Sequence, residues 1–125
     1  MASSFFIASV SDDRKLLNIF ETDLAYAHAL LGDVPLAIGL MEKLIKEQPD
    51  RSVGYCGLVD VLTFYCKRIG LKPDYKKAFA VIEEGKRKAR DQVQWGFDDV
   101  YQSVRAAAKA AGYSVPGKNE QTAST

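Results

Sequence analysis

The stretch LLGDVPLAIGLMEKLIKEQPDR, residues 30–51, decides how the chain folds. It opens on a glycine turn, and Pro35 follows at a place where the first turn of a helix accepts proline. Apolar residues then recur every three or four positions, which is the period of an amphipathic helix. They are Ala37, Leu40, Met41, Leu44 and Ile45. Because Pro49 blocks continuation, the pattern predicts a helix over residues 35–48.

Four more segments have a helical period, over about residues 12–31, 52–69, 74–90 and 92–111. The first has a plausible N-cap in Ser11. Its apolar stripe, which we expect to face the core, consists of Leu16, Phe20, Leu24, Ala27 and Leu31. The segment over 52–69 is apolar on nearly every side, which predicts a helix packed between neighbours. No segment alternates as a strand does, so the predicted fold class is all-α.

The expected domain organisation is an N-terminal extension over residues 1–11, one helical domain over 12–112 and a disordered tail over 113–125. The chain has 125 residues, of which 47% are hydrophobic and 26% charged. No apolar run approaches the ~20 residues that span a bilayer, and no basic residue precedes the short apolar patch at the start. We therefore expect a cytoplasmic protein without membrane insertion.

The two cysteines, Cys56 and Cys66, fall on the same predicted helix. Ten residues of helix separate them by about 15 Å, whereas a disulfide needs Cα atoms within about 7 Å. We expect two free thiols with a structural role.

Short turns make consecutive helices fold back on each other, so residues 12–48 and 52–90 predict two helical hairpins. Residues 24–50, LAYAHALLGDVPLAIGLMEKLIKEQPD, resemble a tetratricopeptide repeat. Leu24, Ala25 and Ala27 stand at its first-helix packing positions, Gly32-Asp33 at its turn and Ala37-Ile38 at its second-helix crossing. Leu44 and Pro49 stand at its closing positions. The first unit then spans about residues 18–51.

A looser second unit follows. Tyr55, Leu58 and Val59 begin it in register, and Tyr75, Ala78 and Ile82 match its second helix. About seven extra residues around CKRIGLKPD lengthen it, and no proline closes it. The resemblance thus covers about residues 18–90. It implies a right-handed α-hairpin array of two tetratricopeptide-like units, with the fifth helix as a C-terminal cap.

The resemblance also implies a function, because this family commonly binds a segment of another protein in its concave groove. Carried over position by position, the groove residues are Ile19, Thr22, Tyr26, Ala29, Val53, Cys56, Asp60 and Thr63. None of them is the lysine or asparagine with which some members clamp a C-terminal carboxylate. We therefore expect a non-enzymatic adaptor or chaperone-like module that binds a peptide or helix of a partner protein, with Tyr26 as an anchor.

Charge distribution leaves a nucleic-acid-associated regulator as an alternative. Residues 67–90 hold nine basic and three acidic side chains, a net charge of +6 within a chain of formal net charge +1. The expected basic patch consists of Lys67, Arg68, Lys86, Arg87, Lys88 and Arg90. Glu83 and Glu84 interrupt the band, and the basic residues spread around their helix, which disfavours nucleic acid.

A structural homo-oligomer is the remaining alternative, with the groove or the FFI segment of residues 5–7 occupied by a second copy. The single histidine, His28, is expected inside the packing face of the first unit. It lacks the neighbouring ligands of a metal site, so neither a metal nor a cofactor is expected. The paired carboxylates are adjacent in helices and point about 100° apart, so they do not form an acid–base pair. No catalytic residues are predicted.

Overall fold

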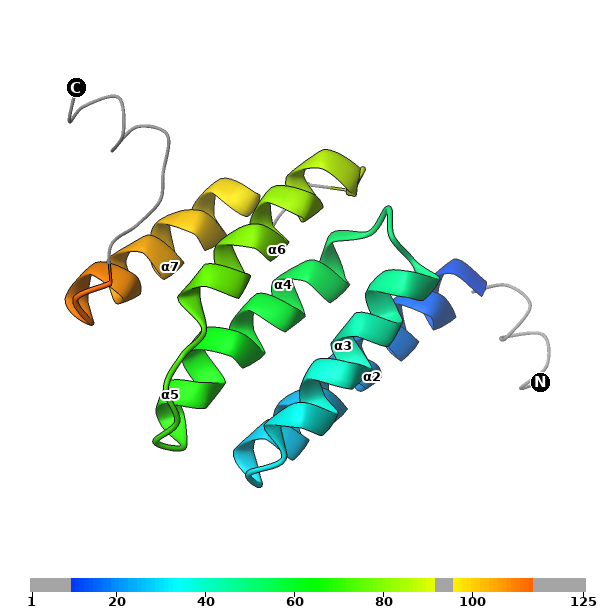
Figure 1. Cartoon of the computed structure of the whole chain (residues 1–125). Helices are drawn as coiled ribbons and strands as arrows, with labels where there is room; N and C mark the ends of the chain where they lie inside the picture. Colours follow the sequence, from blue (N-terminus) through cyan, green and yellow to red (C-terminus); the bar gives the residue numbers. More distant parts are fainter. Residues whose placement is uncertain (1–9, 92–95, 114–125) are drawn as a thin grey trace.

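The computed structural model describes residues 10–91 and 96–113, and the side chains from residue 17 onward (Figure 1). Throughout these residues it contains helices and turns but no strand, so the all-α prediction is confirmed. The elements are α2 (Val10–Leu30), α3 (Val34–Glu47), α4 (Ser52–Asp60), the π-helix η1 (Val61–Tyr65), α5 (Cys66–Arg68), α6 (Tyr75–Lys88) and α7 (Phe97–Ala110). Because α4, η1 and α5 follow one another without a break, we call residues 52–68 the central helix.

Helices that are consecutive in the chain pack side by side, from α2 through α3, the central helix and α6 to α7 (Figure 1). The central helix contacts α2, α3 and α6, and it buries Tyr55, Val59 and Val61 completely. The prediction that this apolar helix lies between neighbours is therefore confirmed.

Small residues allow these close contacts. Ala25, Ala37 and Ala78 are fully buried, as their small size in the hairpins predicted. Three further contacts were not foreseen: a Cβ atom on Gly54 would lie 2.8 Å from Ile45 Cγ1, one on Gly85 would lie 2.6 Å from the Phe97 ring, and one on Gly57 would meet Met41 Sδ. Since real Cβ contacts are longer, only glycine fits at these crossings without a shift.

Several helices end or begin at the residue types that are typical of helix caps. Gly32, Gly70 and Gly112 follow helices and have φ values of 99°, 82° and 82°, in the left-handed region that glycine tolerates. Asp33 accepts a hydrogen bond from the Leu36 N–H at 3.2 Å, and Asp74 accepts one from the Lys77 N–H at 3.0 Å. These carboxylates cap α3 and α6.

Other boundaries differ from the prediction. Ser11 lies inside α2 and is not its N-cap. The predicted helix over residues 92–111 begins only at Phe97, because Gly96 has ψ 136° and breaks it. Residues 92–95, with Trp95, lie outside the described residues. Tyr113, placed in the tail by the sequence, packs against the rings of Tyr75 and Phe79 at centroid distances of 5.7 and 6.3 Å.

The main correction concerns the apolar stripe of α2. Its described members, Phe20, Leu24, Ala27 and Leu31, are exposed, while Asn18, Ala25 and Ala29 face the core. The repeat resemblance had likewise placed Leu24 and Ala27 at packing positions. His28, which was expected inside the packing face, is only half-buried. The period identified an apolar stripe correctly, but the small residues define the side on which the neighbouring helices pack.

Candidate functional site

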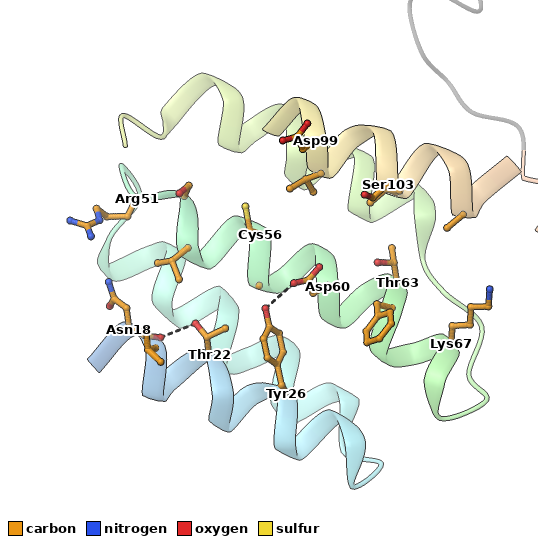
Figure 2. A pocket seen from close by; sticks show the side chains of 18 of the residues that line it. Asn18, Thr22, Tyr26, Arg51, Cys56, Asp60, Thr63, Lys67, Asp99 and Ser103 are labelled. Carbon is orange, nitrogen blue, oxygen red and sulfur yellow. Dashed lines mark hydrogen bonds between the residues drawn. The ribbon is translucent and has the colours of Figure 1, made fainter. Parts of the chain in front are cut away.

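A groove of about 1180 Å³ runs between α2, the central helix and α7 (Figure 2). This exceeds the roughly 300–1,000 Å³ of most small-molecule pockets and leaves room for a chain segment. α2 lines it with Asn18, Ile19, Thr22 and Tyr26, and the central helix with Ser52, Val53, Cys56, Gly57, Asp60, Thr63, Phe64 and Lys67. α7 contributes Asp99, Val100, Ser103, Val104 and Ala107, and Arg51, Tyr75 and Asp91 complete the lining.

Seven of the eight groove residues taken from the repeat resemblance line this groove. They are Ile19, Thr22, Tyr26, Val53, Cys56, Asp60 and Thr63. The eighth, Ala29, does not, since it is fully buried in the core. Two helices far apart in the sequence thus bring these residues to one surface.

The sequence reasoning missed the wall that α7 supplies. The fifth helix was assigned a capping role, but Asp99, Ser103 and Ala107 face the groove from α7. They recur every four residues beside the apolar positions that pack on α6. That spacing was readable in the sequence, yet nothing there placed α7 opposite α2.

Tyr26 and Asp60 point toward each other in the middle of the groove (Figure 2). The Tyr26 hydroxyl donates a hydrogen bond of 2.9 Å to Asp60 Oδ2. The Tyr26 ring stacks on Tyr65, with centroids 4.5 Å apart and planes at 19°. No hydrogen bond from a described residue reaches Asp60 Oδ1, which leaves this oxygen available to a ligand.

Burial shifts the pKa values of the side chains at the bottom of the groove. It raises the pKa of Asp60 above its usual value, although the Tyr26 hydrogen bond acts in the opposite direction. Burial, together with the Asp60 charge, also raises the pKa of Tyr26. The same two causes, with Asp91 as a smaller third, raise the pKa of Cys56 to about 12. A thiol that stays protonated at neutral pH is a poor nucleophile, so Cys56 suits contact with a ligand better than catalysis.

The π-helix η1 begins directly after Asp60. Inside it, the buried Thr63 hydroxyl donates a hydrogen bond of 2.8 Å to the Val59 carbonyl. The Leu62 carbonyl accepts a hydrogen bond of 2.9 Å from the Asp74 N–H in the loop before α6. Single π-helical turns often occur at functional sites, and no sequence pattern indicated this one.

The two ends of the groove carry cations, Arg51 at one and Lys67 at the other (Figure 2). Arg51 Nε lies 3.2 Å from Asp91 Oδ2, and Asp91 Oδ1 accepts a 2.7 Å hydrogen bond from the Ser52 N–H. Asp91 therefore neutralises Arg51 and also caps the start of α4. Lys67 is exposed and has no ion-pair partner among the described residues.

The predicted basic patch is not one surface, which corrects the sequence interpretation. Lys67 and Arg68 end the central helix, whereas Lys86, Arg87 and Lys88 end α6, at the other end of the molecule (Figure 1). The 14 residues of α6 span about 20 Å. Two of the charges are also paired: Lys86 with Asp98 at 3.6 Å, and Lys88 with Glu84 at 2.9 Å. Arg90, just past α6, is exposed at that same end.

In residues 10–91 and 96–113, no three potential metal ligands cluster, and no helix is long and apolar enough to span a membrane. Cys56 and Cys66 are free thiols, as the helical spacing predicted.

Comparison with protein-family models, with curated proteins and with solved structures found no match to this chain.

Proposed function

We propose that this chain is a non-enzymatic protein-interaction module of tetratricopeptide-like design, which binds a helix or peptide of a partner protein in its groove. The observation that carries the proposal is the convergence of seven groove positions, inferred from the repeat resemblance, on one large groove. The order of helices also supports it, because α2 and the central helix, the first helices of the two inferred units, line the groove.

The charge and burial of Asp60 indicate the chemistry of the ligand. A carboxylate held away from water costs free energy unless it is paired, and its Oδ1 atom has no hydrogen-bond partner among the described residues. A lysine or arginine of a ligand would supply that pairing. Around Asp60, the side chains of Ile19, Val53 and Val100 offer apolar contacts. The proposed ligand is an apolar helix or peptide with one cationic side chain near its centre.

The test is a selection of binding peptides from a displayed random library, followed by affinity measurement on the selected peptides. Peptides enriched in apolar residues and one central lysine or arginine are expected. Asp60→Lys should weaken their binding at least about tenfold, since a hydrogen bond to a charged group contributes about 1.5–3 kcal/mol. Tyr26→Ala should weaken it as well, because it removes the anchor and the donor to Asp60.

Glu83→Lys is the matched control, since it makes the same charge change on an exposed residue of α6 outside the groove. It should leave binding unchanged. Equal loss in Asp60→Lys and Glu83→Lys would contradict the groove as the binding surface. The nucleic-acid alternative has lost support, because its basic residues lie at two ends of the molecule and include paired side chains.

A further inference from the structure

The outer face of α2 is apolar, and the described residues leave about half or more of the surface of its large side chains exposed. Leu17, Phe20, Leu24 and Leu31 are 59%, 59%, 50% and 82% exposed. With the exposed Ala27 they follow a spacing of three and four residues, so Leu17, Phe20, Leu24 and Ala27 share one side of α2, and Leu31 follows directly after the helix. That side is opposite Asn18, Ala25 and Ala29, which face the core. We call these five residues, 17, 20, 24, 27 and 31, the outer stripe.

The position of this stripe in the fold argues that it is covered in solution. α2 is the first described helix of a row of packed helices, and no described helix covers its outer face, which in such an array has to be polar or covered. α2 has leucines and a phenylalanine there instead. Contiguous apolar surface of this kind is typical of a protein–protein contact.

The spacing of the outer stripe specifies the geometry of its partner. Residues 17, 24 and 31 recur every seven positions, and residues 20 and 27 fall between them, as the a and d positions of a coiled coil do. Helices with such a seam pair along their length. The small Ala27 lets the two backbones approach.

We propose that the outer stripe pairs with the outer stripe of a second copy of this chain, as a parallel two-fold dimer. The flanking charges favour this occupant and this direction. Glu21 and His28 border the stripe on one side, and Asp23 borders it on the other. In parallel pairing, Asp23 meets His28 of the second copy, and the imidazole can donate a hydrogen bond to the carboxylate. The antiparallel register that packs Phe20 against Leu24 of the second copy would instead set each of the two acids against its own counterpart.

This dimer leaves the groove open, because the groove lies on another side of α2, lined by Ile19, Thr22 and Tyr26. The seam spans only about two heptads and its side chains are partly covered already, so the dissociation constant should be micromolar or weaker. The proposed dimer therefore does not depend on the groove ligand, and either the dimer or ligand binding in the groove can be disproved without the other.

Sedimentation equilibrium of the full chain between about 5 and 500 µM tests it. The wild type should show a reversible monomer–dimer equilibrium, and Leu24→Glu should raise the dissociation constant at least about tenfold. Leu71→Glu is the control, because Leu71 is 48% exposed but follows α5, away from the stripe. Circular dichroism checks that each variant is folded. A monomeric wild type, or a dimer that tolerates Leu24→Glu, would overturn the proposal.

The direction of pairing has its own test. Asp23→Lys should weaken the dimer, because it removes the carboxylate that meets His28 of the second copy. Adding His28→Glu should restore the dimer, since the introduced lysine of each copy would then face the introduced glutamate of the other. In the antiparallel register that packs Phe20 against Leu24, the second substitution would leave the two introduced lysines against each other, and in the register that packs Leu24 against Ala27 it would set the introduced glutamate against Glu21. A double variant as weak as Asp23→Lys alone would therefore refute the parallel arrangement.

Discussion

At the scale of single residues, Asp60 is the most unusual group in the described chain. It is mostly buried, accepts a hydrogen bond from Tyr26 at 2.9 Å and has a raised pKa. A carboxylate at the bottom of a groove costs stability when it is ionised. Groups of this kind are concentrated at functional sites, where binding offsets their cost.

This cost predicts a pH-dependent effect of Asp60→Asn. Because the folded-state pKa of Asp60 is raised, its contribution to stability is present in acid and is lost as pH rises through that pKa. The asparagine can still accept the Tyr26 hydrogen bond but cannot ionise. The variant should therefore melt a few degrees higher than wild type at pH 7, and the gain should vanish in acid, near pH 3. Thermal melts at both pH values measure this, and a lower melting temperature at pH 7 would contradict it.

At the scale of elements, the close approach of α6 and α7 depends on one glycine. A Cβ atom on Gly85 would lie 2.6 Å from two atoms of the Phe97 ring and 3.0 Å from Tyr55 Cγ. Tyr55 and Phe97 also meet edge to face at 6.3 Å. Since both rings are held in the core, neither can easily move away from an added methyl group. This contact fixes α7 against α6 and so helps to set the width of the groove.

We expect Gly85→Ala to destabilise the protein by about 1–3 kcal/mol through overpacking. Gly39→Ala is the control: Gly39 is exposed in α3, a Cβ atom there meets nothing within 4 Å, and alanine is the better helix former. It should stabilise the protein by about 0.5–1 kcal/mol. Urea denaturation of both variants measures the two changes. An equal gain in both would show that the helices shift to accept the methyl group at no cost.

At the scale of the whole molecule, the central helix joins three of the other described helices. It packs on α2, α3 and α6, and its residues form the floor of the groove. α2, by contrast, has neighbours on one side and the exposed outer stripe on the other. Stability should therefore decrease from the centre of the array toward α2.

Hydrogen exchange tests this gradient. In the Leu24→Glu variant, which keeps α2 unpaired, amides of residues 55–62 should exchange most slowly, because exposing them requires breaking contacts with several helices. Amides of α2 should exchange faster. Slower exchange in α2 than in the central helix would mean that the stability of the molecule resides in the first hairpin instead.

The sequence by itself determined the helices, since their apolar period, glycine ends and proline positions are local properties. It also determined the small buried residues Ala25, Ala37 and Ala78, and seven groove positions through the repeat resemblance. The tertiary structure alone decided which side of α2 faces the core. A period of three and four residues defines a stripe without stating what lies opposite it, and in α2 the leucines turned outward.

The third wall of the groove and the separation of the basic residues were likewise decided by tertiary structure. Each depends on how helices distant in sequence are placed, and local spacing carries no information about that placement. Charge counted along the chain suggested one basic band over residues 67–90, but an antiparallel hairpin carries the two ends of such a band to opposite ends of the molecule.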